Sequence, residues 1–341
     1  MRVVELVEFG LGGLRELERP VPEPGPGEVR VRMEAASINY HDLATVMGMA
    51  NPRMPLPQVP LSDGAGVVDA LGDGVEGLSP GQRVSSVFFP DWQAGRPSLA
   101  ALRRVTGETV PGVLGEYRLA PASALMPAPA HLSAAQIATL PCAALTAWRA
   151  VVVEGKVKAG DRVLLQGTGG VSLFALQFAR MLGAETFITS SSDDKLARAR
   201  ALGADHGINY RSEPKWGKAV RKLTGGEGVD LVVEVGGAGT LPESLNAVAI
   251  GGHISMIGVL TGVASTVPTA KIMALNATVR GITVGSREHF QAMNRAIALH
   301  SLEPVIGETL GFAELRQGLE LMQSGGHFGK IVLQAGLTSD V

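Results

Sequence analysis

The stretch VLLQGTGGVSLFALQFA, residues 163–179, decides the fold expected of this chain. Its first residues are apolar and predict a buried strand, and an apolar helix begins directly after Gly167, Gly169 and Gly170. Glycines in this place permit a tight turn and close approach of the backbone to a ligand, and the amides at a helix amino terminus can bind a pyrophosphate. Such a turn can also be purely structural, so the surrounding sequence has to decide between the two interpretations.

Around this stretch, apolar strands and amphipathic helices alternate six times. The strand–helix pairs occupy residues 161–183, 185–203, 206–225, 229–252, 253–276 and 277–300. The alternation predicts an α/β fold made of βαβ units, with a doubly wound parallel sheet covered by helices on both faces. In this context the glycine-rich turn predicts a Rossmann dinucleotide-binding domain, which we expect to span residues 123–301.

The two ends of the chain have a different pattern. Residues 28–38, EVRVRMEAASI, alternate polar and apolar side chains, and short apolar segments separated by Gly, Pro and Asp continue to about residue 120. This pattern is typical of an all-β unit. The tail returns to strand-like sequence at residues 304–312 and 329–334. We therefore expect residues 1–122 and 302–341 to form one β-rich domain.

Composition and charge exclude several classes of function. The 341 residues carry a net charge of −2, which gives no reason to expect nucleic acid or an anionic membrane as a partner. No apolar run reaches the roughly 18–20 residues of a membrane span, and the amino terminus resembles a strand rather than a signal peptide. With a single cysteine, Cys142, neither a disulfide within the chain nor a cysteine-rich zinc lobe can form, and we expect a cytoplasmic location.

The end of the second strand bears on which dinucleotide is bound. A protein built for NAD normally has Asp or Glu there to bind the ribose 2′-hydroxyl, whereas this chain has Ser190, Ser191 and Ser192. A carboxylate about 4 Å from a 2′-phosphate would cost roughly 4 kcal/mol at an effective dielectric near 20, so its absence is informative. Lys195 follows one turn into the next helix, and Tyr210 follows the next strand. We expect NADP(H) in preference to NAD(H).

A structural interpretation of the three serines stays open. Serine caps helix amino termini well, and Asp193 and Asp194 would then lie in the favourable first turn of the helix. The same two aspartates weaken the case for a bound phosphate.

Several motifs together resemble the medium-chain dehydrogenase/reductase superfamily over essentially the whole chain. They are VPLSDGAGVVDALGDGVEGLSPGQRV (59–84), QGTGGVSLFALQFARMLGA (166–184), ALGADHGINYR (201–211) and GKIVL (329–333). Within the superfamily the chain most resembles bacterial zinc-type alcohol dehydrogenase-like proteins and quinone oxidoreductases. The resemblance implies a GroES-like β domain beside the Rossmann core, and a homodimer paired through the edge strand expected at residues 277–285.

The resemblance also implies cofactor contacts beyond the glycine-rich turn and the serines. The adenine side would lie near the backbone of Gly236, and the nicotinamide near residues late in the core and in the tail. The full set of predicted cofactor residues is Gly167, Thr168, Gly169, Gly170, Val171, Ser190, Ser191, Ser192, Lys195, Tyr210, Gly236, Val259, Gly285, Ser286, Phe328 and Lys330.

The stretch AASINYHDLATV places Asn39 where zinc-dependent members of the superfamily carry a catalytic cysteine. Where those members have Gly-His-Glu, this chain has Leu61, Ser62 and Asp63, and Cys142 corresponds to the one remaining thiolate. Asparagine and serine are poor zinc ligands. We therefore expect no catalytic zinc, and we expect Cys142 to line the substrate site.

Without a metal, hydrogen-bond donors have to stabilise the oxygen that becomes basic when hydride reaches the substrate. Asn39 can offer its amide, and Tyr40 its phenol if that side chain points inward. His41 falls where zinc alcohol dehydrogenases place the residue that passes the substrate proton; it is either a proton donor or a partner of a backbone carbonyl or the cofactor ribose. Asp42 and Asp63 match positions that are mostly structural, although Asp63 stays a catalytic candidate.

Aromatic side chains concentrate in residues 87–117, where the zinc lobe would lie. Phe88, Phe89 and Trp92 stand there in a chain with only 4% aromatic residues. They predict either an apolar wall of the substrate site, with Phe89 and Trp92 as substrate contacts, or ordinary packing.

The sequence thus predicts an NADPH-dependent, zinc-independent oxidoreductase that reduces a small apolar carbonyl, enone or quinone in a cleft between its two domains. Quinone is the weakest of these substrates, because the superfamily's quinone reductases often have a tyrosine shortly after the position of His41 and this chain has none there. Two alternatives stay open: an alcohol dehydrogenase acting in the oxidising direction, and an NADPH-binding sensor or scaffold without turnover.

Overall fold

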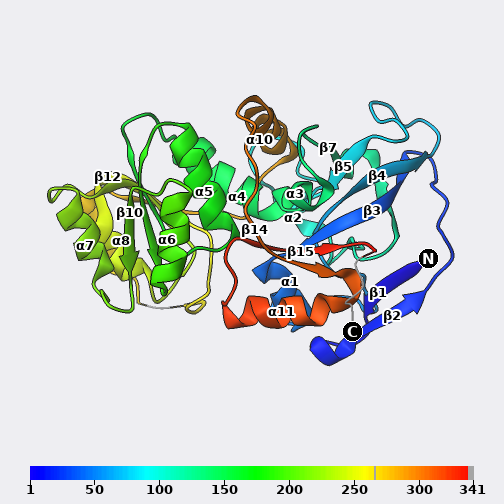
Figure 1. Ribbon diagram of the computed structural model, residues 1–341, viewed down its shortest axis with the longest axis horizontal. Coiled ribbons are helices and arrows are strands. Elements are labelled where there is room, and N and C mark those ends of the chain that lie inside the picture. Colours follow the sequence, from blue (N-terminus) through cyan, green and yellow to red (C-terminus); the bar gives the residue numbers. More distant parts are fainter. Residues whose placement is uncertain (265, 337–341) are drawn as a thin grey trace. The chain divides into compact units, whose positions relative to one another are not determined.

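The computed structural model describes residues 1–264 and 266–336, and the backbone contacts separate the chain into two units (Figure 1). The first unit consists of residues 1–145 and the described residues from 285 onward. The second unit is residues 146–284.

The second unit is built on a six-stranded parallel sheet with the strand order β10-β9-β8-β11-β12-β13. Its strands are β8 (Arg162–Leu165), β9 (Glu185–Ser190), β10 (His206–Asn209), β11 (Val229–Glu234), β12 (Val248–Met256) and β13 (Thr278–Gly281). The chain runs outward from β8 to β10, returns to the centre at β11 and runs outward again to β13. This is the doubly wound parallel sheet that the alternating sequence predicted.

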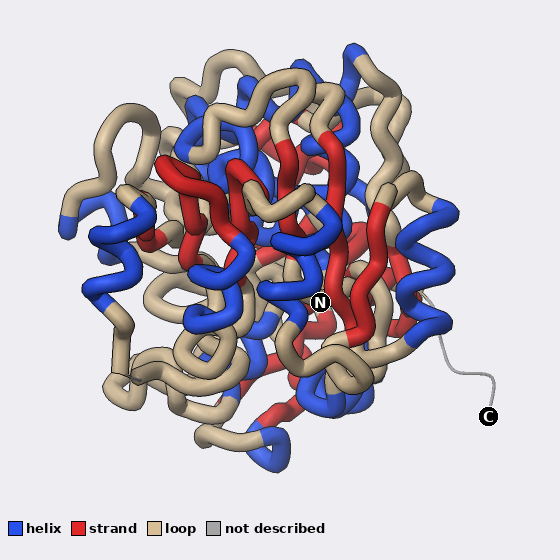
Figure 2. Tube along the Cα trace, turned by 90° about the vertical axis from the view of Figure 1, so that its left-hand side faces the viewer, coloured by secondary structure: helices blue, strands red, loops and turns tan. Residues whose placement is uncertain are grey.

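Helices cover both faces of this sheet (Figure 2). They are α5 (Gly170–Met181) after β8, α6 (Asp193–Ala201) after β9, α7 (Trp216–Leu223) after β10 and α8 (Leu241–Ala247) after β11, and α7 and α8 pack against each other. Trp216 and Leu245 belong to one apolar core with Leu164 and Phe187 of the strands. The remaining helical segments are α4 (Leu145–Trp148), η4 (Arg149–Glu154) and α9 (Thr269–Leu275).

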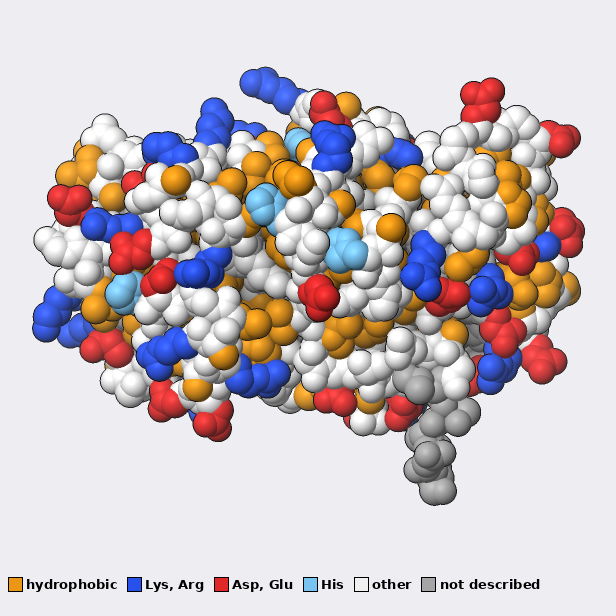
Figure 3. All heavy atoms as spheres, turned by 45° about the horizontal axis from the view of Figure 1, so that its top comes forward, with side chains coloured by type: hydrophobic (Ala, Val, Ile, Leu, Met, Phe, Trp, Pro, Cys, Tyr) orange, Lys and Arg blue, Asp and Glu red, His pale blue; other side chains and the backbone are white. Residues whose placement is uncertain are grey.

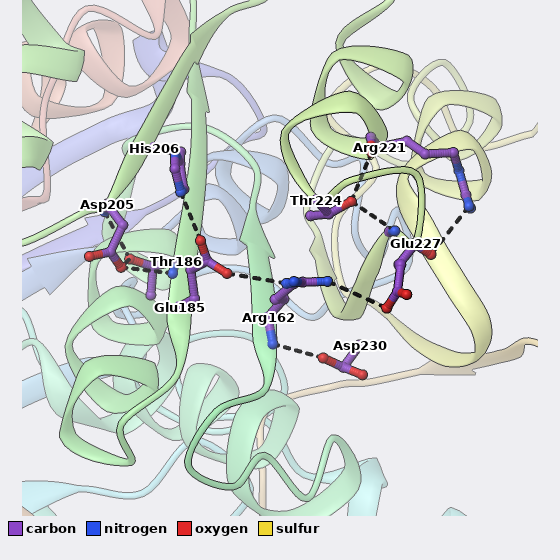
Figure 4. A network of polar contacts seen from close by, with 10 residues as sticks. Arg162, Glu185, Thr186, Asp205, His206, Arg221, Thr224, Glu227 and Asp230 are labelled. Atoms are coloured by element: carbon purple, nitrogen blue, oxygen red, sulfur yellow. Dashed lines mark hydrogen bonds and ion pairs between the residues drawn. The ribbon is translucent and has the colours of Figure 1, made fainter.

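Ion pairs join the amino ends of neighbouring strands in this sheet (Figure 4). Arg162 Nε of β8 donates to Glu185 Oε2 of β9 at 3.2 Å, and His206 Nε2 of β10 lies 2.9 Å from Glu185 Oε1. The amide of Arg162 donates to Asp230 Oδ2 at 2.8 Å. The charges at this edge are satisfied within the protein, and the glycine-rich turn lies at the opposite, carboxyl-terminal edge.

The first unit is built on a seven-stranded, mostly antiparallel sheet with the order β14-β15-β3-β4-β5-β7, in which β6 also pairs with β3. Its strands are β3 (Glu28–Ile38), β4 (Asp63–Leu71), β5 (Arg83–Ser86), β6 (Tyr117–Pro121), β7 (Leu125–Pro127), β14 (Ile306–Gly311) and β15 (Lys330–Gln334). A separate hairpin joins β1 (Arg2–Leu6) to β2 (Leu14–Glu18). The tail strand β15 pairs with β3, so the expected return of the tail to the β-rich domain is observed.

The period of two in residues 28–38 is confirmed by burial, because Val29, Val31 and Met33 lie in the core and Arg32 is exposed. The helical segments of this unit are short, apart from two in its second half. They are η1 (Leu11–Gly13), α1 (Tyr40–Val46), α2 (Leu99–Arg103), η2 (Ala122–Ala124), α3 (Ala134–Ile137), η3 (Leu140–Ala144), α10 (Arg287–Leu299), η5 (Phe312–Glu314) and α11 (Leu315–Ser324).

The unit boundaries differ from the 122/123 and 301/302 boundaries expected from the sequence. Strand β7 pairs with β5, and the amide of Cys142 donates to Asp63 at the start of β4. Arg287 of α10 donates to the Leu125 carbonyl at 3.0 Å. These contacts tie residues 123–145 and 285–301 to the β-rich unit, although their sequence is largely helical.

Basic and acidic side chains are interspersed on the face that Figure 3 shows, in keeping with the small net charge. Across residues 1–264 and 266–336, no helix combines the length and the apolar composition needed to cross a membrane.

Candidate functional site

A buried polar cluster lies where β3 ends and α1 begins. Asn39 is the amino-terminal cap of α1, and its backbone amide donates to Asp42 Oδ2 at 2.7 Å. Asn at the cap and Asp three residues later favour helix initiation. Asn39 is 6% exposed, whereas the next residue, Tyr40, is 39% exposed. The helix start therefore turns Asn39 inward and Tyr40 outward, so Tyr40 is not part of the cluster.

Lys330 brings a positive charge into this cluster from the far end of the chain. Strand β15 pairs antiparallel with β3, which sets Ile331 opposite Ile38. The Lys330 ammonium donates to the Ile38 carbonyl at 2.7 Å and to Asn39 Oδ1 at 2.5 Å. The sequence predicted Lys330 as a cofactor contact; the structure engages its ammonium with the strand end and with Asn39.

Both carboxylate oxygens of Asp63 accept a hydrogen bond within the cluster. Ser62 Oγ donates to Asp63 Oδ1 at 2.7 Å, and the Cys142 amide donates to Asp63 Oδ2 at 3.0 Å. Ser62 also links the two acids, because its amide donates to Asp42 Oδ1 at 3.0 Å. The side-chain Nδ2 of Asn39 donates to Ser62 Oγ at 3.4 Å. We call Asn39, Asp42, Ser62, Asp63, Cys142 and Lys330 the Asn39 cluster.

Burial governs the protonation of this cluster. It raises the pKa of Asp63 to about 6; the neighbouring charge of Asp42 acts in the same direction, and Lys330 opposes both. Burial also raises the pKa of Asp42, and it lowers the pKa of Lys330 although Asp63 and Asp42 counteract this. The cluster therefore contains a carboxyl group that changes its protonation near neutral pH.

His41, one residue further along α1, faces Glu108. Its Nε2 lies 3.1 Å from Glu108 Oε2 at an ion-pair distance, although the alignment falls short of a hydrogen bond, and its side chain remains 30% exposed. Burial by itself lowers the pKa of His41, but the carboxylates of Glu108, Asp42 and Asp63 outweigh it and the pKa lies above its usual value. His41 is thus placed to carry a proton near neutral pH.

The predicted aromatic wall is a chain of ring contacts that starts at His41. The rings of His41 and Phe88 meet edge to face with centroids 5.1 Å apart, followed by Phe88 with Phe89 at 4.7 Å and Phe89 with Trp92 at 6.1 Å. All three aromatic residues are buried, and Trp92 Nε1 donates to the Gly95 carbonyl. They pack against one another, and Phe88 also contacts the ring of His41. Contact of a substrate with Phe89, Trp92 or the partly exposed Cys142 stays a prediction.

The side chains that could ligate a metal ion are dispersed in the described part of the chain. Within residues 1–264 and 266–336, no three or more His, Cys, Asp or Glu side chains converge in a way that could hold one. At the position of the zinc ligands in the superfamily, Asn39 already accepts a hydrogen bond from an ammonium group. A second cation beside Lys330 would be repelled by it.

The glycine-rich turn combines a left-handed residue with the start of a long helix. Gly167 follows β8 with φ +72°, a left-handed conformation that favours glycine, and a Cβ there would meet no atom within 4 Å. Gly169 caps α5, a helix of 12 residues, and no side chain covers its amino terminus from the cap position. The helix is anchored by Ser172 Oγ, which donates to the Gln166 carbonyl at 2.5 Å. Thr168, Gly170 and Val171 complete this turn.

The serines at the end of β9 are both helix caps and part of a basic region. Ser192 caps α6, since its Oγ accepts from the Lys195 amide at 3.3 Å, and Ser190 Oγ accepts from the Ser192 amide at 3.4 Å. Burial lowers the pKa of Lys195, and the nearby charges of Arg198 and Arg211 lower it further.

Of the two aspartates that follow, Asp193 accepts a hydrogen bond from Asn209 Nδ2 at 3.0 Å. Ser191 is half-buried beside these caps, and Tyr210 is exposed just after β10. Basic side chains and capping hydroxyls thus occur together, and the binding of a phosphate there stays a prediction.

The remaining predicted cofactor residues fall into two groups. In the second unit, Val259 is exposed, whereas the amides of Gly236 and Gly237 donate to the buried carboxylate of Glu234. In the first unit, Ser286 caps α10 by accepting from the His289 amide at 3.2 Å. Gly285 precedes that cap, and Phe328 is buried two residues before Lys330.

Two acids were missed in the sequence: Glu108, which faces His41, and Glu234, which organises the turn after β11. Glu108 lies in a loop at residues 104–116 without a recognisable motif, and nothing local indicates that it faces His41. Glu234 ends β11 next to two glycines, and an acid at the end of an apolar strand was a signal that could have been noticed. It accepts hydrogen bonds from the side chains or amides of Gln166, Gly236, Gly237, Thr240 and Ser244.

Two family models match the chain. Residues 25–130 match the alcohol dehydrogenase GroES-like domain, and residues 170–299 match the zinc-binding dehydrogenase family. A zinc-type alcohol dehydrogenase-like protein of Schizosaccharomyces pombe is 43% identical over 332 residues, which cover 95% of this chain and 96% of that protein. Human quinone oxidoreductase is 28% identical over 343 residues, with 98% and 97% covered.

Solved structures are also similar to this chain over nearly its whole length. A putative alcohol dehydrogenase from Sinorhizobium meliloti superposes with a TM-score of 0.92 at 42% identity, covering 98% of both chains. An NAD-dependent alcohol dehydrogenase superposes with a TM-score of 0.91 at 39% identity, covering 98% of this chain and 100% of that one. A mycobacterial protein complexed with NADPH has a TM-score of 0.82 at 27% identity, covering 98% and 99%.

Proposed function

This chain belongs to the medium-chain dehydrogenase/reductase superfamily, and on that premise we propose that it is an NADPH-dependent, zinc-independent reductase of small apolar carbonyl or enone compounds. The oxidoreductase class follows from its relatives, which are named alcohol dehydrogenases and quinone oxidoreductases. The choice of cofactor, the independence from zinc and the class of substrate are the parts that we propose.

The preference for NADPH is supported by the charges at the end of β9. No acid stands at the strand end, and Lys195, Arg198 and Arg211 lie close enough for their charges to interact. Asp193 is engaged by Asn209, so one of the two nearby acids is already committed. A 2′-phosphate would find cations there, as Arg and Lys are the usual phosphate partners. One relative is known as NAD-dependent and another was solved with NADPH, so the relatives do not decide between the cofactors.

Independence from zinc is supported by Lys330. Its ammonium bonds Asn39 Oδ1 at the position where zinc-dependent members place a thiolate. The Lys330 ammonium would balance the negative charges of Asp63 and Asp42, which a metal ion does in zinc-dependent members.

The single observation that carries the proposed chemistry is the His41–Glu108 pair. When bound, NADPH supplies a hydride. His41 is partly exposed, and the carboxylate of Glu108 beside it helps to hold its pKa above the usual value although burial opposes this. Reduction of a carbonyl needs one hydride at carbon and one proton at oxygen, and His41 would give that proton as a general acid. Asn39, held by Lys330 and Ser62, would act as a positioning residue behind it.

The alternative in the oxidising direction is favoured by the names of several relatives. There the same His41 would accept the proton of an alcohol, and catalysis would improve as the pH rises above the His41 pKa. In the reducing direction catalysis would weaken over the same range, so pH profiles in both directions distinguish the two.

An association into dimers is a further part of this proposal. Strand β13 is the edge of the six-stranded sheet, and its residues are largely exposed. An unpaired edge strand can pair with a second copy of the chain. Light scattering of the purified protein tests this, and a monomer at micromolar concentration would contradict it.

The decisive experiment is a screen of NADPH and NADH oxidation against carbonyl, enone and quinone compounds, combined with metal analysis of the same protein. We expect NADPH turnover without bound zinc and without inhibition by chelators. Lys195→Ala should lower kcat/KM for NADPH about tenfold and leave the NADH value nearly unchanged, because one charged contact to a phosphate is lost. Lys158→Ala, on the exposed Lys158, is the matched control. NADPH binding without oxidation of any compound would favour the sensor or scaffold instead.

A further inference from the structure

Arg118 occupies a core-facing position of strand β6 although it is charged. It is 7% exposed. Side chains alternate along a strand, so Arg118 faces the same side as Ala120, which belongs to the hydrophobic core of the first unit. An apolar residue would be expected at this position.

Arg118 also has no acceptor within the protein. Among residues 1–264 and 266–336, no hydrogen bond or ion pair reaches its side chain, and its Nε is shielded from solvent without a partner. The buried Arg149 in the second unit shows the ordinary arrangement: its guanidinium donates to Glu154 Oε1 at 3.1 and 3.2 Å and to the Thr283 carbonyl at 3.2 Å.

Nε of this guanidinium is shielded from water without gaining an acceptor, which is costly to the fold. Burial lowers the pKa of Arg118 to about 10, and no neighbouring charge offsets it. A buried charge that keeps its proton usually has an anion beside it, because otherwise the lost hydration is not replaced. The protein does not supply that anion in the part described.

A cavity of about 180 Å³ adjoins Arg118. One water molecule needs about 10–15 Å³ of such volume, so the cavity is far larger than a single bridging water requires. Its walls include the apolar side chains of Val3, Val59, Val113 and Leu119. The cavity is open to solvent on one side, and a short hydrocarbon chain would bury apolar surface against these walls.

Backbone hydrogen bonds hold the walls of this cavity in place. The Val4 amide donates to the Leu114 carbonyl at 3.0 Å, and the Gly112 amide donates to the Val59 carbonyl at 2.8 Å. On the other side, the Glu116 amide donates to the Arg2 carbonyl at 3.0 Å. The cavity therefore does not depend on a loop that would have to close, and a ligand would bind a site that is already formed.

From these observations we propose that the cavity beside Arg118 is a binding site for a small carboxylic acid with a short aliphatic chain. The carboxylate accepts hydrogen bonds from the guanidinium, which matches it in a two-pronged geometry, and the chain lies against Val3, Val59 and Val113. Arg118 provides the one charged side chain among the lining residues, and the terminal ammonium of Met1, which also lies at the lining, already donates to the Arg19 carbonyl at 2.6 Å. A monoanion therefore suits the site better than a phosphate dianion. The site shares no residue with the Asn39 cluster, so it does not rest on the proposed reductase activity.

Calorimetric titration of the full chain with hexanoate and with the uncharged hexanamide tests the proposal. We expect one hexanoate per chain and binding of hexanamide weaker by about tenfold or more, since the amide lacks the charge that Arg118 pairs with. Arg118→Met should weaken hexanoate binding by a similar factor. Arg32→Met, which removes a half-exposed arginine of the neighbouring strand β3, should leave it unchanged.

Thermal unfolding provides a second measurement that does not depend on a well-folded variant. Hexanoate should raise the Tm of the wild-type chain and not that of Arg118→Met, and without ligand the variant should unfold at the same temperature as the wild type or higher. Equal binding of hexanoate and hexanamide, preference for inorganic phosphate over hexanoate, or undiminished binding to Arg118→Met would each overturn the proposal.

Discussion

Each unit of the protein buries a carboxylate at the end of a strand, and the two are held in different ways. Glu234 in the second unit receives five hydrogen bonds, all from neutral donors. Asp63 in the first unit receives hydrogen bonds from Ser62 and from the Cys142 amide, and it shares its surroundings with Asp42 and Lys330.

The difference lies in the charges around the two acids. Neutral donors converge on Glu234 and tie the turn after β11 to Gln166 before the glycine-rich turn. At Asp63 a second acid and a buried ammonium leave the balance of charge dependent on pH. Groups with a perturbed pKa, such as Asp63, concentrate at functional sites, which is why we place the proposed chemistry in the first unit.

The largest expected effect concerns Glu234. Glu234→Gln replaces one acceptor oxygen by an amide that cannot accept, so at least two donors lose their partner in a fully buried place. We expect the free energy of unfolding to fall by about 3–5 kcal/mol, measured by urea denaturation at neutral pH. Glu227→Gln, on an exposed side chain, should change it little. A stable Glu234→Gln would mean that the five bonds are not what holds this turn.

The next effect concerns the pH dependence of stability at Asp63. Its pKa rises from 3.8 to about 6 on folding, so the folded chain binds this proton more tightly than the unfolded chain. The free energy of unfolding should therefore fall as the pH rises from about 4 to about 6, by about 3 kcal/mol in total. Asp63→Asn should flatten this slope, and Asp73→Asn, at an exposed position, should keep it. If the free energy of unfolding of Asp63→Asn kept the same slope against pH, Asp63 would not be the group that causes it.

A smaller effect, on catalysis, concerns His41 and Glu108. His41→Asn should lower kcat/KM for reduction about 100-fold, as expected for loss of a general acid, whereas His300→Asn, at an exposed site, should not. Because the acid form is required, the rate falls as the pH rises through the His41 pKa. Glu108 raises that pKa, so Glu108→Gln should move the fall to lower pH. A profile that stays in place would argue that the pair is structural.

The smallest effect concerns the hydrogen bonds that link Glu234 to the glycine-rich turn. Ser172 Oγ donates to the Gln166 carbonyl, and the Gln166 side chain donates to Glu234. Ser172→Ala removes one hydrogen bond and should lower the free energy of unfolding by about 1 kcal/mol, with a small rise in the KM for NADPH. Thr186→Ala also removes a hydroxyl, but at the amino-terminal end of β9, and should leave that KM unchanged. Equal effects of both variants on KM would argue against the link.

The parts that could be predicted from the sequence are those with a local cause. Glycines at 167, 169 and 170 and the alternation of residues 28–38 reflect backbone geometry and burial over a few residues, and both were found as expected. The outward position of Tyr40 beside the buried Asn39 was likewise foreseeable from neighbouring residues that face opposite ways. The domain boundaries were not, because β7 and α10 join the first unit through contacts that no local pattern contains.

The environment of the candidate site required the folded chain. Lys330 meets Asn39 across 291 residues of sequence, and Glu108 faces His41 from a loop without a motif. Arg118 looks like an ordinary strand residue until its burial and its missing acceptor are known. Local propensities depend on a few bonded neighbours, whereas the pKa of a side chain depends on every charge and every apolar wall around it, and these are assembled only when β3, β4 and β15 pair into one sheet.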